Sequence, residues 1–202
     1  MSRHREVIFR AVTVPASAVF VVRASLAFAA NPARVAMLLV MISELLATAL
    51  LLLSKTPKRR DMRPVAMACA LWSFVYAAFL GVAPGYHCLD GNICGAIGAA
   101  GLVLTISGKM AIGRSFGVLP ATRAIVRIGP YRFIRHPIYV GYFITHAGFL
   151  LADFTLRNLI VLGSLHLCQI VRVLREEKLL GQEAAYRAYC RDVPYRFVYG
   201  LI

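Results

Sequence analysis

Residues 65–83, VAMACALWSFVYAAFLGVA, form a nineteen-residue run without a charged side chain. As an α-helix this run is about 28 Å long, close to the thickness of the hydrocarbon core of a bilayer. Residues 35–53 form a second run of nineteen residues, in which Glu44 is the only ionisable side chain. Apolar runs of this length are typical of transmembrane helices, so the sequence predicts an all-α membrane protein.

Two more apolar segments flank these runs. Residues 7–30 carry Arg10 and Arg23 near their ends, where long side chains reach the lipid head groups. Residues 93–107 are shorter and rich in glycine and alanine, a composition that favours close packing on a neighbouring helix of the same or another chain. We therefore expect four membrane spans, at about 7–30, 35–53, 65–83 and 93–107.

A helical hairpin is predicted in the C-terminal half. Residues 138–152 and 159–171 are apolar, but each is only about 20–23 Å long as a helix. Residues 172–192 then favour a polar helix that Pro194 ends. The predicted fold is a polytopic transmembrane helical bundle of four spans plus this C-terminal helical hairpin, five to six membrane helices in all.

The distribution of charge predicts the orientation of the helices. The chain has a formal net charge of +14, which in a soluble protein would suggest nucleic acid. Here the cations lie in residues 54–64, 109–135 and the C-terminal segment, whereas residues 84–92 contain no Lys or Arg. The positive-inside rule places the basic segments in the cytoplasm. We expect a multi-pass protein of a bacterial inner membrane that binds no nucleic acid, with its C-terminus cytoplasmic and anionic inner-leaflet lipid around the excess charge.

The five cysteines follow no metal-ligand or thiol-redox spacing, so no metal site is expected. Cys69 and Cys168 lie in apolar runs and are most simply small core residues. Cys88 and Cys94 lie near the extracytoplasmic face, where a disulfide and two unrelated thiols are both open alternatives.

The first polar cluster lies in residues 129–142, Gly-Pro-Tyr-Arg-Phe-Ile-Arg-His-Pro-Ile-Tyr-Val-Gly-Tyr. Pro137 suits the first position of a helix, because its fixed φ fits there and no backbone donor is needed. Arg135 and His136 would then precede a helix N-terminus, where backbone N–H groups favour an anion such as a carboxylate. The alternative is an anchor of arginine and tyrosine at the membrane interface.

The second cluster is Arg-Glu-Glu-Lys at 175–178. Glu177 has no cation at helical spacing, so it needs a tertiary partner, either an arginine such as Arg132 or a ligand ammonium. Glu44 is also an intramembrane carboxylate, and pairing with a neighbouring helix or protonation explains it equally well. Because the two clusters lie at the two ends of one hairpin, they are expected to meet in space. Such a site suits a small zwitterionic, aromatic ligand beside a lipid-soluble partner.

The ordered motifs resemble the isoprenylcysteine carboxyl methyltransferase family, which belongs with the phospholipid N-methyltransferases among integral membrane methyltransferases. The resemblance covers about residues 113–195. The tail Arg196-Phe197-Val198-Tyr199 departs from the pattern, because it lacks a second proline after Val193-Pro194. The motifs that carry the resemblance are Gly113-Arg114-Ser115-Phe116, Gly129-Pro130-Tyr131-Arg132, Arg135-His136-Pro137-Ile138-Tyr139-Val140-Gly141, Glu176-Glu177, Tyr186 with Tyr189, and Val193-Pro194.

The resemblance implies S-adenosylmethionine as cofactor at the cytoplasmic face, with a lipophilic acceptor entering from the bilayer. It assigns the methionyl ammonium to Glu176 or Glu177, and the lack of a local cation favours Glu177. Arg135 would pair with the methionyl carboxylate or with the acceptor, so Arg135 and Glu177 are the predicted catalytic residues. The predicted cofactor-binding residues are Tyr131, His136, Pro137, Tyr139, Gly141, Glu176 and Glu177.

The predicted function is that of a membrane methyltransferase acting on a carboxylate, an amine or a thiol of a lipophilic small molecule or lipid. Residues 1–107 are expected to form a scaffold and lipid-substrate half, and residues 108–202 a cofactor-binding catalytic half of one domain. Two alternatives stay open: a membrane NADPH-dependent reductase of the sterol reductase type, and a non-catalytic lipid-binding membrane protein.

Overall fold

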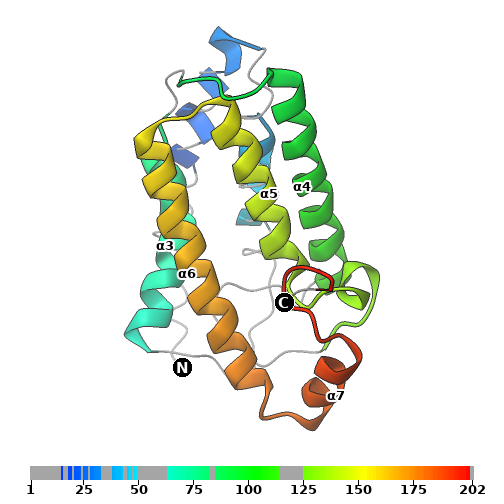
Figure 1. Cartoon of the computed structure of the whole chain (residues 1–202). Coiled ribbons are helices and arrows are strands. Elements are labelled where there is room, and N and C mark those ends of the chain that lie inside the picture. The colour runs from blue at the N-terminus through cyan, green and yellow to red at the C-terminus, as the bar shows by residue number, and fades with distance from the viewer. Residues whose placement is uncertain are drawn as a thin grey trace.

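The computed structural model describes residues 63–81, 85–113 and 125–200, together with parts of 15–49 (Figure 1). Most of the predicted spans 7–30 and 35–53 therefore lies outside the described residues, as do Glu44 and residues 114–116. The described secondary structure is helical and contains no β-strand, only an isolated bridge between Tyr86 and Phe154. The prediction of an all-α fold is confirmed.

The helices of the described region follow the predicted apolar runs. α4 is longer than predicted at both ends, because the Asp90 carboxylate caps its first turn by accepting from the backbone N–H of Asn92 at 2.9 Å, and Gly113, with φ +53°, ends it. Among the described helices, α4 and α6 are long and apolar enough to cross a membrane. The elements are α3 (Pro64–Phe79), α4 (Gly91–Ile112), the short 3₁₀ helix η2 (Gly129–Arg132), α5 (Pro137–Ala152), α6 (Leu156–Leu180) and α7 (Ala184–Asp192).

The prediction of one polar helix over 172–192 is wrong. α6 continues from the membrane run to Leu180, and a turn at 181–183 separates it from α7. In this turn the N–H of Gly181 donates to the carbonyl of Glu177 at 2.8 Å, and the N–H of Glu183 donates to that of Leu180 at 2.9 Å. The chain changes direction at this turn, so that α7 folds back beneath the bundle (Figure 1).

The four long helices of the described region pack as two pairs, and the consecutive helices α5 and α6 belong to different pairs. α5 packs mainly against α4, and α6 mainly against α3, while α5 and α6 touch each other less (Figure 1). Glycines allow the close approach of α4 and α5, since a Cβ on Gly141 would lie 2.7 Å from the carbonyl oxygen of Gly101. The glycine-rich run predicted to pack on a neighbour therefore packs within the chain, on α5.

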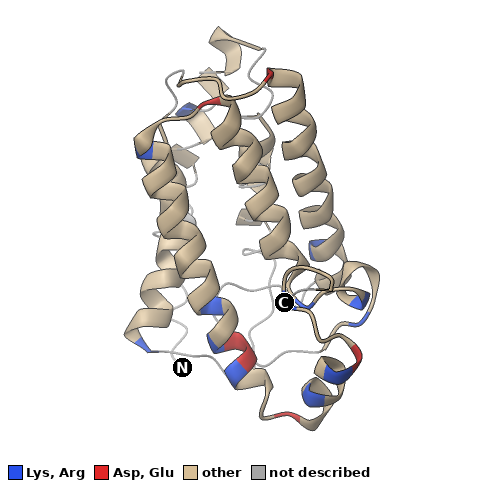
Figure 2. Cartoon of the chain, viewed as in Figure 1, with Lys and Arg blue, Asp and Glu red and all other residues tan. Residues whose placement is uncertain are grey.

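The two interhelical loops are joined at the end of the bundle opposite α7. Tyr86 and Phe154 exchange two backbone hydrogen bonds of 2.9 Å, and the N–H of Gly81 donates to the Asn158 side chain at 2.8 Å. Cys88 and Cys94 in this region are free thiols, as are the other three cysteines, so the alternative of unrelated thiols holds. At the other end of the bundle, Lys and Arg residues lie on the last turns of α6, on α7 and in the segment around η2 (Figure 2).

Replacing Gly101 by alanine is expected to destabilise the protein by about 1–3 kcal/mol, because the new Cβ would lie 2.5 Å from the backbone nitrogen of Thr145. The matched control is Gly163→Ala on α6, where a Cβ meets nothing within 4 Å and alanine favours the helix. Thermal midpoints in detergent check this. Equal midpoints for the two variants would contradict the close packing of α4 on α5.

Candidate functional site

Three chain segments meet where α5 begins and α6 ends. The N–H of Arg135 donates to the carbonyl of Tyr195 at 2.9 Å, and the N–H of His136 donates to that of Arg196 at 3.0 Å. The tail after α7 thus lies alongside the residues that precede α5. Pro137 occupies the first position of α5, as the sequence predicts, and His136 is the residue before it.

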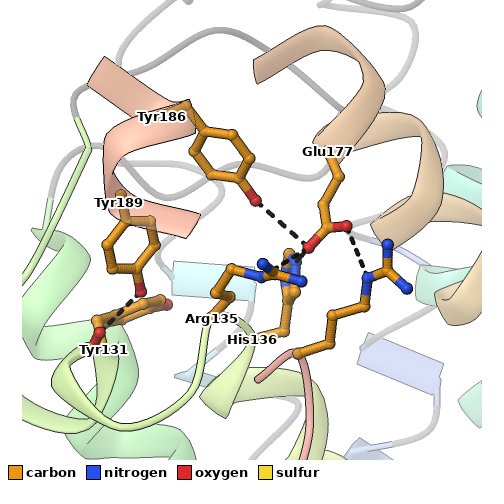
Figure 3. Close-up of polar contacts among 7 residues, drawn as sticks. Tyr131, Arg135, His136, Glu177, Tyr186 and Tyr189 are labelled. Atoms are coloured by element: carbon orange, nitrogen blue, oxygen red, sulfur yellow. Dashed lines mark hydrogen bonds and ion pairs between the residues drawn. The ribbon is translucent and has the colours of Figure 1, made fainter. Parts of the chain in front are cut away.

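Helix α7 is held against η2, and this fixes the course of the tail. The Tyr189 hydroxyl donates to the carbonyl of Tyr131 at 2.7 Å (Figure 3). Tyr186, Tyr189 and Val193 form a small apolar core beneath the bundle. Burial raises the pKa of Tyr189 to about 12, so its hydroxyl keeps its proton and remains a donor at neutral pH.

Glu177 is the centre of the site (Figure 3). Its Oε1 lies 3.0 Å from Nε of Arg135 and 3.2 Å from Nε2 of His136, and it accepts from the Tyr186 hydroxyl at 3.4 Å. Its Oε2 accepts from Nε of Arg196 at 2.7 Å. The carboxylate therefore joins the last turn of α6 to the start of α5, to α7 and to the tail. We call Glu177, Arg135, His136, Arg196 and Tyr186 the Glu177 cluster.

The cluster keeps Glu177 ionised. Glu177 lies more than one turn beyond Val171, where the apolar run of α6 ends. Burial by itself would raise its pKa, but hydrogen bonds from His136 and Arg196 and the charge of Arg135 outweigh burial and lower the pKa to about 2. Burial, together with the charge of Glu177, raises the pKa of Tyr186, so this hydroxyl stays protonated.

The structure brings the two predicted clusters together, which confirms that the ends of the hairpin meet. The arginines that contact Glu177 are Arg135 and Arg196; the suggestion of Arg132 is wrong, because that side chain is exposed on η2. The sequence left two alternatives for the partner of Glu177, an arginine or a ligand ammonium. In this structure the side chains of Arg135 and Arg196 contact its carboxylate.

The remaining predicted residues lie next to the Glu177 cluster or at the neighbouring helix contacts. The Tyr139 ring lies 5.8 Å from the His136 ring and 5.6 Å from the Arg172 guanidinium, which also donates to the Ser73 hydroxyl at 2.9 Å. Gly141 lies at the α4–α5 contact, Tyr131 is buried on η2, and Glu176 is half-buried beside Glu177. Their predicted cofactor contacts stay predictions.

Sequence reasoning missed Arg196 and the contact made by Tyr186. Arg196 is nineteen residues from Glu177 in the sequence. The only feature that the sequence analysis identifies in residues 196–199 is the lack of a second proline after Val193-Pro194. The contact of Arg196 with Glu177 depends on the turn at Gly181 and on the backbone pairing of residues 195–196 with 135–136. Neither feature can be predicted from the spacing of residues in the sequence. Within the described residues, no group of three or more His, Cys, Asp or Glu side chains is placed to hold a metal ion.

Comparison with known protein families identifies one segment of the chain. Residues 93–186 match the family model described as phospholipid methyltransferase. This segment runs from the first turn of α4 into α7, and so contains Arg135, His136, Glu177 and Tyr186. A comparison with curated proteins gives no significant match. The resemblance to this group of membrane methyltransferases is confirmed.

Replacing Glu177 by glutamine is expected to lower stability by up to about 3 kcal/mol at neutral pH, because an ionised carboxylate bound by cations is lost. A carboxylate with a depressed pKa stabilises the fold above its ordinary pKa of 4.5, and this contribution disappears as the pH falls toward 2. The thermal midpoint of Glu177→Gln in detergent should therefore fall less than that of the wild type between these pH values.

The control for this measurement is Glu183→Gln, a change of the same chemistry at an exposed position. Its thermal midpoint should follow the wild type at every pH. Parallel pH profiles for Glu177→Gln and the wild type would show that the carboxylate does not stabilise the fold.

Proposed function

Because residues 93–186 match the family model described as phospholipid methyltransferase, we propose that the chain is an integral membrane methyltransferase that uses S-adenosylmethionine and a lipophilic acceptor. The observation that carries this proposal is the Glu177 cluster, an ionised carboxylate and an arginine held together at the start of α5. The aminoacyl end of S-adenosylmethionine carries an ammonium and a carboxylate, and the cluster offers a partner for each.

Glu177 is proposed to bind the methionyl ammonium, and Arg135 the methionyl carboxylate. The Oε1 of Glu177 is held by Arg135, His136 and Tyr186, whose side chains are largely buried. Its Oε2 is held by Arg196 alone among these contacts, and the Arg196 side chain is 40% exposed. An ammonium can therefore replace Arg196 on Oε2 without disturbing the partners of Oε1.

Aromatic side chains support the same assignment. The rings of His136 and Tyr139 lie next to each other on the side of α5 that faces Arg172 and Glu177. An aromatic face attracts a cation such as a sulfonium, and stacks on a purine ring. Pro137 fixes the start of α5 and so the direction of both rings. Tyr131, Gly141 and Glu176 are proposed to support the site through packing and charge.

The chemical demand on the protein is modest. S-adenosylmethionine supplies a methyl group on a sulfonium, which an in-line displacement transfers to the acceptor. The protein must align the two reactants and exclude water. Glu177 and Arg135 would orient the cofactor, and the tail that carries Arg196 would cover it. A carboxylate acceptor is ionised and needs no base, whereas an amine or a thiol must lose a proton.

The charge distribution supports a cytoplasmic position for this site. Two apolar helices, α4 and α6, are long enough to cross the bilayer, and the α7 end of the bundle carries most of the basic residues that the structure describes (Figure 2). Under the positive-inside rule this end faces the cytoplasm, where S-adenosylmethionine is made. The proposed arrangement is multi-pass, with the acceptor arriving from the membrane side of α5 and α6.

Glu177→Gln and His136→Ala are each expected to weaken S-adenosylmethionine binding roughly ten- to a hundredfold, because each loses a charge-assisted or aromatic contact. Isothermal titration calorimetry of the purified protein in detergent measures this, and Glu183→Gln should bind like the wild type. Unchanged affinity in both site variants would contradict the assignment of the cofactor site.

S-adenosylhomocysteine is expected to raise the thermal midpoint, whereas NADPH should leave it unchanged, because only a ligand that binds the native state stabilises it. Stabilisation by NADPH alone would instead support the reductase alternative. A protein that neither ligand stabilises would fit the non-catalytic, lipid-binding alternative.

A further inference from the structure

The end of the chain folds back onto the Glu177 cluster. After α7, Val193 packs with Tyr186 and Tyr189 in the small apolar core beneath the bundle. Residues 195–200 then lie at the start of α5 (Figure 1). We call residues 195–200 the tail segment. Its contacts fall on the residues that are proposed to bind the cofactor, so its effect on cofactor binding can be worked out contact by contact.

The first contact places backbone oxygens in front of α5. The carbonyl oxygens of Tyr195 and Arg196 accept from the backbone N–H groups of Arg135 and His136, at 2.9 and 3.0 Å. These two residues immediately precede Pro137, the first residue of α5. Backbone N–H groups at the N-terminus of a helix favour an anion such as a carboxylate. The tail segment therefore places acceptor oxygens next to Arg135, the proposed partner of the methionyl carboxylate.

The next two contacts place a cation on Glu177 and an aromatic ring beside His136. Nε of Arg196 donates at 2.7 Å to Oε2 of Glu177, the oxygen proposed to bind the methionyl ammonium. The ring centroids of Phe197 and His136 lie 6.0 Å apart, with the two planes tilted by 41°. The His136 ring is one of the two rings proposed to face the sulfonium or the purine.

The tail segment thus presents acceptor oxygens, a cation and an aromatic ring to the site. S-adenosylmethionine carries the corresponding groups: a carboxylate, an ammonium and a purine. A guanidinium and an ammonium on the same carboxylate oxygen repel each other, because both carry a positive charge and lie a few ångströms apart. Arg196 and the cofactor therefore compete for Glu177.

The contacts of the tail segment are of a kind that can be broken and remade. The Arg196 side chain is 40% exposed, whereas those of Arg135 and His136 are 9% and 7% exposed. An ion pair that faces water contributes little to stability. Residues 198–200 are exposed, whereas Val193 is buried. The tail segment can therefore leave the site while α7 stays in place.

Closure of the tail segment also keeps Glu177 paired when no cofactor is bound. The Glu177 side chain is only 12% exposed, and a charge removed from water is costly unless it has a partner. Arg135 and His136 hold Oε1 whether the cofactor is present or absent. Oε2 would receive Arg196 in one state and the methionyl ammonium in the other. The carboxylate stays paired in both states, which differ in the cation that it binds.

We propose that the tail segment is an internal competitor of the cofactor: it occupies the site in the cofactor-free protein, and S-adenosylmethionine binds only when Arg196 leaves Glu177. This inference rests on the proposed function. Once Arg196 has left Glu177, the tail segment covers the bound cofactor. A competitor within the chain lowers the apparent affinity, because only the fraction of molecules with an open site can bind. Weakening the competitor should therefore strengthen cofactor binding, whereas loss of a cofactor ligand weakens it.

The first test measures the affinity of S-adenosylhomocysteine, which has the same aminoacyl end, by isothermal titration calorimetry in detergent. Arg196→Gln removes the cation and should raise the affinity roughly three- to tenfold, because the closed state loses its ion pair. Arg196→Lys keeps the positive charge, and its affinity should be closer to that of the wild type. The matched control is Arg191→Gln, the same loss of charge at an exposed position of α7, which should bind like the wild type.

The second test follows the Arg196 side chain directly by nuclear magnetic resonance of protein labelled with nitrogen-15 arginine. In the cofactor-free protein the Nε–H proton of Arg196 should exchange slowly with water, because it is bonded to Glu177. Its resonance is assigned by its loss in Arg196→Gln or Arg196→Lys. Saturating S-adenosylhomocysteine should shift this resonance and speed the exchange of the proton. A resonance that the bound ligand leaves unchanged would overturn the proposal.

The outcomes separate this proposal from the proposed function. A wild-type protein that binds neither S-adenosylmethionine nor S-adenosylhomocysteine would refute the methyltransferase assignment, and the competition with it. Normal binding by the wild type together with weaker binding by Arg196→Gln would refute only the competition, and would make Arg196 a cofactor ligand. Equal affinities of Arg196→Gln and the wild type would also refute it, and would show that the ion pair is structural.

Discussion

The Glu177 carboxylate is the constraint around which the described structure is arranged. A carboxylate whose side chain is only 12% exposed is tolerated only if cations and donors surround it, and its partners come from the start of α5, from α7 and from the tail. The turn at Gly181, the packing of α7 on η2 and the pairing of residues 195–196 with 135–136 all serve to deliver those partners. The packed helices of the bundle place the end of α6, which carries Glu177, beside the start of α5.

The helices of the bundle are held together by two kinds of contact. α4 and α5 approach so closely that their backbones nearly touch, which only glycine allows at Gly101 and Gly141. α3 and α6 instead pack through larger side chains, with Tyr76, Leu162 and Leu165 in the shared core. Two polar contacts join these pairs of helices: His146 on α5 lies 3.3 Å from His166 on α6, and His136 lies 3.2 Å from Glu177.

The sequence predicted those features that depend on neighbouring residues. Uncharged runs predicted α3 and most of α4, and the Pro137 start of α5 followed from the fixed φ of proline. The meeting of His136 with Glu177 followed from the hairpin, because its two ends must lie together. The sequence did not predict the role of Arg196 or the contact between His146 and His166. Their contacts join residues far apart in sequence, and lone histidines in apolar runs at 146 and 166 have no spacing that marks them.

The backbone pairing between residues 135–136 and 195–196 has a consequence for the order of synthesis. The membrane helices can insert and pack while the ribosome is still translating, since α3, α4, α5 and α6 all precede the tail. The site is completed only after residue 196 has left the ribosomal tunnel. Arg196 is therefore the last member of the Glu177 cluster to be synthesised.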